Sequence, residues 1–295
     1  MGGGSWTSKD FATYSTSRGL SYDVTTGAID SRGLTAQVMY KSHSLSAALD
    51  PRNVVRECCD SDEHPNTIPV ILALDVTGSM GDTAVEVASK LNVIMTELYN
   101  SVQDVEFMVM GIGDFYCDDS PLQVSQFESD IRIAEQLDKI WFESGGGGND
   151  YESYTAAWAF AVEHTKLDCW NRGRKGLLIT IGDEPLNPYI NKDRWQVEVG
   201  PTELSLETKD VYQAVIDKYD VYHIHVQHGG NYYGNVAPAS FAKVIGKDHV
   251  ETATVKSIAQ TITAIVNKHA SNNSCVVGVD LAAGTQFTED GAICW

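Results

Sequence analysis

An aspartate directly follows an apolar run in the segment IPVILALDVTGSMG, residues 68–81. The run shows no alternation of polar and apolar residues, which is typical of a parallel strand that helices cover on both faces. Open α/β sheets bind their ligands at the carboxyl ends of such strands. Asp75 is therefore predicted to bind a ligand or to take part in chemistry, together with the hydroxyls of Thr77 and Ser79. The alternative is that Asp75 only caps a helix that starts near Asp82.

Two further apolar runs end on acidic residues in the same way. FMVMGIGD ends on Asp114, and LLITIGD ends on Asp183 with Glu184 next to it. Because parallel strands bring their carboxyl ends to one edge of the sheet, we expect Asp75, Asp114 and Asp183 to face a common crevice. The segment SGGGGNDYES lies between two of these runs and is interpreted either as a close approach of the backbone to that crevice or as a flexible linker. After the glycines, Asn149, Asp150, Glu152 and Ser153 offer side-chain oxygens at the start of a predicted helix.

The composition describes a globular chain with a strong negative charge. Its 295 residues are 43% hydrophobic, and 40 acidic against 21 basic residues give a formal net charge of −19. Such a charge repels nucleic acid and anionic membrane surfaces and favours divalent cations or basic partners. No apolar segment has the length of a membrane span and the first residues lack the pattern of a signal peptide, so we expect a cytoplasmic protein.

Cysteine and histidine residues give no standard metal motif. The six cysteines are too sparse for a disulfide framework and form no CxxC pair, so we expect most of them to be reduced. The segments CCDSDEH (58–64) and HIHVQH (223–228) hold ligands that zinc accepts, but their spacing matches no standard zinc site. We interpret the alternating histidines as one face of a strand.

The chain divides into a polar beginning and a regularly patterned remainder. Residues 1–65 are dense in Ser, Thr, Gly and Asp, which predicts an extension that wraps a neighbour. From Thr67 onward strand and helix patterns alternate, which predicts a parallel sheet with helices on both faces. Strands are expected at 68–74, 105–114, 175–185 and 221–227 and near Val124, and helices at 82–101, 129–142, 151–166, 207–218, 238–245 and 254–269.

Four segments, DVTGS, GIGDFYCDD followed by FESD, GGGGNDYES and ITIGDEP, resemble von Willebrand factor type A (vWA) domains in type and order. DVTGS fits the Asp-x-Ser/Thr-x-Ser pattern that opens the metal-ion-dependent adhesion site of that family. The resemblance covers about residues 66–270 and is strongest to the subgroup found beside alpha-kinases, although no kinase domain is present. It implies a Rossmann-like, doubly wound, mostly parallel six-stranded sheet in a domain over 66–272, after the extension and before a tail at 273–295.

The resemblance also implies a metal site. Asp75, Thr77 and Ser79 would form its first loop and Asp183 the carboxylate of the fourth-strand loop, while Asp150 stands where most of the family has a threonine. The cation would be Mg²⁺ or Mn²⁺, with the hydroxyls binding directly and the two strand-end carboxylates acting through water. Few direct carboxylate ligands leave such a cation electrophilic, so an Asp or Glu of a protein partner is expected to complete its shell.

The predicted function is a metal-dependent protein-interaction module without enzymatic activity, and an AAA-type ATPase is a partner expected by analogy alone. A second interpretation is a structural component of a particle or multiprotein assembly. A third is a phosphohydrolase of the haloacid dehalogenase type, with Asp75 as nucleophile, Lys175 as charge stabiliser and Asp183 as magnesium ligand. Val76 and Thr77 speak against this third interpretation, because they replace the lysine and the acid/base aspartate of that class.

Overall fold

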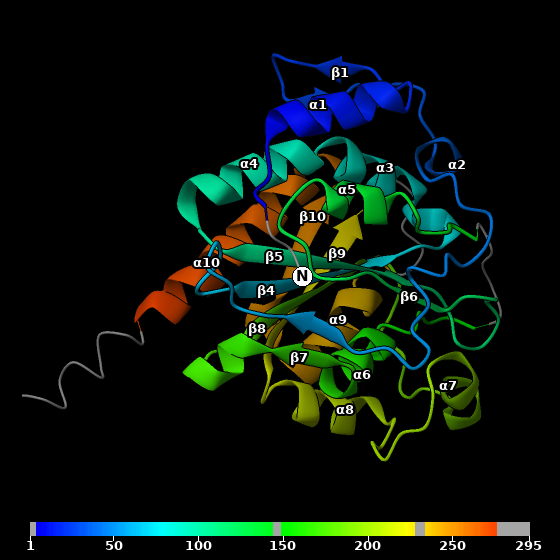
Figure 1. The fold of residues 1–295 in the computed structure, drawn as a ribbon. Coiled ribbons are helices and arrows are strands. Elements are labelled where there is room, and N and C mark those ends of the chain that lie inside the picture. Colours follow the sequence, from blue (N-terminus) through cyan, green and yellow to red (C-terminus); the bar gives the residue numbers. More distant parts are fainter. Residues whose placement is uncertain (1–3, 144–148, 228–233, 276–295) are drawn as a thin grey trace, which may run out of the picture.

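The centre of the fold is a six-stranded sheet. The computed structural model describes residues 4–143, 149–227 and 234–275. Neighbouring strands of the sheet follow the order β10-β9-β8-β4-β5-β6 (Figure 1). All pairs are parallel except β5 with β6, so the sheet is mixed, with an antiparallel edge. The strands are β4 (Ile68–Asp75), β5 (Val105–Ile112), β6 (Leu122–Val124), β8 (Gly176–Gly182), β9 (Tyr219–Gln227) and β10 (Val250–Thr254).

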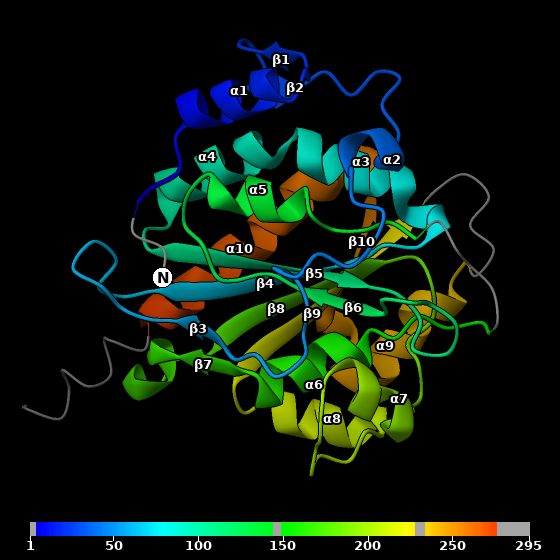
Figure 2. The same cartoon turned by 45° about the vertical axis from the view of Figure 1, so that its right-hand side comes forward.

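Helices cover both faces of the sheet, as Figures 1 and 2 show. One layer contains α3 (Gly81–Ser89), α4 (Leu91–Ser101), α5 (Arg132–Leu137) and α10 (Ile258–Cys275), and α1 (Ser8–Ser17) and α2 (Ala36–Met39) pack on its outer side against α4 and α3. The other contains α6 (Thr155–Glu163), α7 (Lys192–Glu198), α8 (Thr208–Val215) and α9 (Val236–Ile245). Two small sheets pair β1 (Tyr22–Asp23) with β2 (Ala28–Ile29) and β3 (Arg56–Cys58) with β7 (Thr165–Leu167). Short 3₁₀ turns are η1 (Gly78–Met80), η2 (Asp168–Arg172), η3 (Lys247–His249) and η4 (Val255–Ser257).

The central strand β4 is buried along nearly its whole length, which explains its unbroken apolar sequence. Successive side chains of a strand point to opposite faces. Val70, Leu72 and Leu74 accordingly pack in the core with α3, α4 and α10, whereas Ile71 and Ala73 pack in the core with α6 and α8. The apolar run therefore forms part of two hydrophobic cores at once.

The polar beginning of the chain packs on the same domain. Trp6, Phe11 and Tyr40 are buried in the core that α3 and α4 share with the sheet. The Trp6 indole donates to Asn92 Oδ1 at 2.9 Å, and the Tyr40 hydroxyl donates to the Ala84 carbonyl at 2.8 Å. The division at residue 66 stays a prediction, but the segment before it contributes several buried side chains to this layer of the fold.

Most of the predicted elements are present, some with shorter and some with longer bounds. The strands expected at 68–74, near Val124, at 175–185 and at 221–227 all form, whereas the one at 105–114 ends at Ile112 and leaves Asp114 in a loop. The helix expected at 82–101 is two helices, because Lys90 leaves the helical conformation with φ −97° and ψ 6°. The glycine run at 145–148, His228 and the tail beyond 275 lie outside the described residues.

Three helices are shorter than predicted, including the one expected at 207–218, which spans only α8. Several elements were not predicted, among them β3, β7, β10 and α7. The helix expected at 129–142 spans only α5, and the one expected at 151–166 spans only α6. The latter starts late because the backbone N–H of Glu152 and that of Ser153 donate to carbonyls of other loops, those of Pro185 and Gly113. The missed strand β10 is an edge strand with one buried residue, Ala253, so its sequence carries no apolar alternation. The helix α7, also missed, is short and polar.

No helix among the described residues is long and apolar enough to cross a membrane.

A histidine of β9 lies within the core. His223 is fully buried, its ring is stacked on Phe241, and Tyr154 packs edge-on against it. Its Nδ1 lies 3.0 Å from Thr180 Oγ1, while no residue that the structure describes is hydrogen-bonded to its Nε2. Burial lowers the pKa of His223 well below its usual value, since the charged ring would lose its hydration.

The buried His223 should make stability fall in acid. Below about pH 6.5 the His223 side chain takes up a proton in the unfolded chain but stays neutral in the folded protein. The free energy of unfolding therefore falls as the pH falls below that value, by at most about 1.4 kcal/mol per pH unit. Urea unfolding at pH 7.5 and 5.5 should show a smaller loss for His223→Gln than for the wild type. His43→Gln, at an exposed position, should lose as much unfolding free energy between the two pH values as the wild type. Equal losses in all three proteins would contradict the role given to the buried His223.

Candidate metal centre

The candidate site lies where the strand order of the sheet reverses. The first strand of the sheet along the chain, β4, lies between β5 and β8, and the connections leave in opposite directions from it. In open α/β sheets this switch point is where ligands bind, outside the carboxyl ends of the strands. β4 ends on Asp75, and β8 is followed directly by Asp183. The pairing of Leu74 with Ile181 brings these two strand ends together, as the sequence predicted.

Two hydroxyls are hydrogen-bonded to the two carboxylates. The Thr77 hydroxyl donates to Asp75 Oδ1 at 2.6 Å, and the Thr77 backbone N–H donates to the same oxygen at 2.9 Å. The Ser79 hydroxyl donates to Asp183 Oδ1 at 3.0 Å. Thr77 is buried, whereas Ser79 is exposed in the turn that leads to α3. Four of the five predicted metal-binding residues are therefore brought together.

A tyrosine holds the other oxygen of the first carboxylate. The Tyr154 hydroxyl donates to Asp75 Oδ2 at 2.8 Å from a fully buried position before α6. A Cβ atom at Gly182 would lie 1.9 Å from that hydroxyl, so only glycine leaves room for it. Tyr154 was not predicted as part of the site from the sequence. The available signal is a glycine immediately before a strand-end aspartate, which marks a close approach by another group.

The carboxylates at this edge repel each other. Burial raises the pKa of Asp75, and the charge of Asp183 raises it further, while the donors Thr77 and Tyr154 act in the opposite direction. Burial and the charge of Asp75 raise the pKa of Glu184 to about 7. A divalent cation between Asp75 and Asp183 would offset this repulsion, and oxygen is the donor atom that Mg²⁺ and Mn²⁺ prefer. The donor set therefore fits such a cation.

The second loop places its acidic residues in different environments. Asp150 is exposed, whereas Glu152 is only 4% exposed. Asp114 is held in this loop and not at the Asp75 pair, since it accepts hydrogen bonds from Asn149 Nδ2 at 2.8 Å and from the Ser153 hydroxyl at 3.3 Å. The direct contacts of Asp114 thus differ from those of Asp75 and Asp183, and a crevice common to all three stays a prediction.

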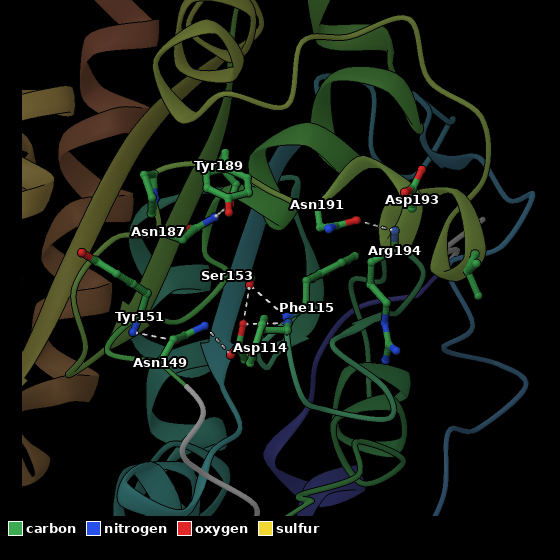
Figure 3. A pocket seen from close by; sticks show the side chains of 13 residues that line it. Asp114, Phe115, Asn149, Tyr151, Ser153, Asn187, Tyr189, Asn191, Asp193 and Arg194 are labelled. Carbon is green, nitrogen blue, oxygen red and sulfur yellow. Dashed lines mark hydrogen bonds between the residues drawn. The ribbon is translucent and has the colours of Figure 1, made fainter.

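A cleft of about 700 Å³ lies next to this edge (Figure 3). Asp114 and Ser153 lie on its wall, and their hydrogen bond is visible in the figure. Three tyrosines that line it, Tyr116, Tyr151 and Tyr189, are exposed. Neither Asp75 nor Asp183 lines this cleft, so the cleft is a neighbour of the candidate metal site and not the site itself.

The residues assigned to a phosphohydrolase do not converge. Lys175 precedes β8 and Asp183 follows it, so a strand of seven residues, about 23 Å long, separates them. The Lys175 ammonium donates instead to the Ile216 carbonyl at 2.6 Å. Asn187 serves the structure, because its Oδ1 accepts from the Thr155 N–H and hydroxyl. The assignment of Lys175 as charge stabiliser is therefore wrong.

The cysteine and histidine segments form no metal site in the part of the chain described here. No group of three or more His, Cys, Asp or Glu side chains there is arranged to hold a metal ion, and the Asp75 cluster relies on hydroxyls in addition to its carboxylates. The histidine of the CCDSDEH segment, His64, contacts Asp104 and the Gly4 carbonyl through its two ring nitrogens. Four cysteines are free thiols, namely Cys58, Cys59, Cys117 and Cys169.

No family model matches the sequence, and no curated protein matches it. Among solved structures, the pilus adhesin SpaC from Lactobacillus rhamnosus GG in its open conformation aligns with 14% identity and a TM-score of 0.47, over 75% of this chain and 31% of the adhesin. The vWF domain of the type V pili tip protein Mfa5 from Porphyromonas gingivalis aligns with 11% identity and a TM-score of 0.44, over 68% of this chain and 95% of that domain. Proximal thread matrix protein 1 from the mussel byssus aligns with 11% identity and a TM-score of 0.44, over 69% of this chain and 48% of that chain. This chain thus spans about a third of the length of the adhesin. Sequence identities of 11–14% and TM-scores below 0.5 assign the chain to no family.

Gly182 should tolerate no side chain. Gly182→Ala would force the Tyr154 hydroxyl away from Asp75, so we expect a loss of about 1–3 kcal/mol in unfolding free energy, as for other overpacked cores. Gly81→Ala is the matched control, because its added Cβ would make only an ordinary 3.6 Å contact with Ala36. Urea unfolding of both variants measures the difference, and equal stabilities would contradict the close approach.

Proposed function

We propose that this chain is a protein-interaction module that binds one divalent cation, Mg²⁺ or Mn²⁺, at Asp75, Thr77, Ser79, Asp150 and Asp183. The observation that supports it best is the pairing of two hydroxyls with two carboxylates at the switch point of the sheet. Each hydroxyl donates its proton to a carboxylate, which leaves its oxygen lone pairs available for a cation. Bound there, the cation would supply a positive charge that attracts an oxygen of a partner.

Exposed groups next to the cluster support a role in binding proteins. Ser79 and Asp150 are exposed, so a partner can approach the cluster from solvent. The cleft nearby offers exposed tyrosines, a residue type that is enriched at protein interfaces. The vWA resemblance of the sequence adds the expectation that the partner contributes an Asp or Glu to the cation. An AAA-type ATPase remains a partner suggested by analogy alone.

If the protein is instead a structural component of an assembly, the same residues have a different role. In that case the cation would stabilise the fold, and its removal would lower stability without a specific loss of partner binding. Metal affinity, metal-free stability and partner binding therefore have to be measured separately.

The chain stripped with EDTA should bind one Mn²⁺ or Mg²⁺. Asp75→Asn removes a charge that holds the Thr77 hydroxyl in place, and loss of a group that orients a ligand typically weakens metal binding by about 10- to 100-fold. Titration calorimetry measures the affinity. The double substitution Thr16→Ala with Ser17→Ala, at exposed hydroxyls of α1, should bind like the wild type. A wild-type protein that binds neither cation would refute the metal site.

Ser79→Ala should separate binding from folding. Ser79 is exposed, so its loss should change metal-free stability by only about 0.5 kcal/mol. Thr77 is less suitable, because it is buried and hydrogen-bonded to Asp75. The wild-type chain captures its partner in Mg²⁺, and mass spectrometry identifies that partner. The partner should no longer be captured when EDTA is added or when the chain carries Ser79→Ala. The control Thr16→Ala with Ser17→Ala should still capture it. Capture that survives both treatments would place the interaction on another surface.

A further inference from the structure

The cleft next to the candidate metal site has exposed aromatic rings on its wall. Tyr116, Tyr151 and Tyr189 line it, and their exposed fractions are 73%, 41% and 56%. Its volume of about 700 Å³ falls within the range of about 300–1,000 Å³ that is typical of ligand sites. Rings that stay in water contribute little to folding, whereas a ligand that covers them would bury their apolar surface. These three rings are therefore accessible to a ligand.

Two aspartates give the same cleft a negative charge (Figure 3). Asp114 and Asp193 line it, and no basic side chain among the described residues forms an ion pair with either of them. The donors to the Asp114 carboxylate are neutral, among them Asn149 Nδ2 at 2.8 Å and the Ser153 hydroxyl at 3.3 Å. Asp193 is exposed on α7. The fold therefore leaves both negative charges uncompensated.

The basic residue in the wall of the cleft, Arg194, is already paired. Its Nε lies 3.1 Å from Glu198 Oε1, and its guanidinium also donates to the Asp118 carbonyl. The other residues that line the cleft are neutral or acidic. Glu198 thus compensates the charge of Arg194, and the cleft keeps the charge of its two aspartates in a chain whose formal net charge is −19.

Two amides in the wall are used for hydrogen bonds within the protein. Asn149 Nδ2 donates to Asp114, and Asn149 Oδ1 accepts from the Tyr151 N–H at 2.9 Å. Asn187 Oδ1 accepts two hydrogen bonds from the first residue of α6, and its Nδ2 donates to the Tyr189 carbonyl at 2.9 Å. A neutral ligand such as a sugar needs free polar groups to fix its orientation. The wall instead offers a ligand chiefly aromatic rings and carboxylates.

We propose that this cleft binds an arginine side chain in a basic segment of a protein partner. A guanidinium group stacks on aromatic faces and donates to carboxylates in a bidentate geometry, so it matches both kinds of group in the wall. The acidic chain also attracts a basic partner over a longer range. The inference goes beyond the proposed metal site, because neither Asp75 nor Asp183 lines the cleft, and it requires no cation.

Peptide binding to the full chain tests the proposal. The probe is a fluorescein-labelled peptide of alternating arginine and glycine, and the comparison peptide has serine in place of each arginine. Fluorescence anisotropy measures both affinities in EDTA and 0.15 M salt, where the screening length of about 8 Å suppresses attraction by distant charges. The wild type should bind the arginine peptide at least about tenfold more tightly than the serine peptide.

Two substitutions in the cleft, each with a matched control, locate the binding. Asp193→Asn should weaken binding of the arginine peptide about two- to fivefold, whereas Asp62→Asn removes the same charge at an exposed position outside the cleft and should change it little. Tyr189→Leu should weaken it about two- to fivefold, because the ring is lost, whereas Tyr189→Phe keeps a ring and should bind within about twofold of the wild type. These side chains are exposed, so all four variants should keep the wild-type melting temperature.

The pattern of affinities decides the outcome. Losses in Asp193→Asn and Tyr189→Leu, with both controls close to the wild type, support the proposal. Equal losses in Asp193→Asn and Asp62→Asn, or equal affinities for the arginine and serine peptides, overturn it. Binding of a labelled neutral hexasaccharide in place of the arginine peptide also overturns it, in favour of a sugar site. Because EDTA is present throughout, none of these results bears on the metal site, which the cation titration tests separately.

Discussion

The structure around the switch point depends on keeping the carboxylate of Asp75 away from water. This side chain has no exposed surface, yet it lies at the end of the most central strand, where a charge is costly to bury. Thr77 and Tyr154 reduce that cost by donating to both of its oxygens. Tyr154 reaches it only because Gly182 has no side chain. A single buried charge thus accounts for the residue choice in three separate segments of the chain.

Hydrogen bonds offset only part of the cost of burying Asp75, and the repulsion from its neighbours remains. Asp183 and Glu184 both lie close enough to influence pKa values in the cluster, and Glu152 is under the same influence. A protein that needed only stability would place apolar residues or a positive charge here. Several acidic groups nevertheless lie around the exposed Ser79, and the whole chain is likewise acidic.

The sequence predicts those parts of the site that lie close together along the chain. Asp75, Thr77 and Ser79 fall within five positions, and the strand before them has an unambiguous apolar pattern. Other parts depend on contacts between distant segments. The burial of Glu152 and the contact of Tyr154 with Asp75 depend on backbone hydrogen bonds between this segment and the loops after β5 and β8. No local sequence pattern reveals such bonds. The edge strand β10 was missed for a related reason, because an exposed edge has no alternation of apolar residues.

The packing of the first segment against α3 and α4 has a consequence for the order of events during synthesis. Trp6 and Asn92 are separated by 86 positions, and the Tyr14 hydroxyl donates to the Ala134 carbonyl, 120 positions later. Contacts over such separations form late, because the intervening chain must first be ordered. The aromatic side chains of this segment are therefore synthesised well before the residues against which they pack. Until those later residues have followed, Trp6 and Phe11 present apolar surface that chaperones could bind.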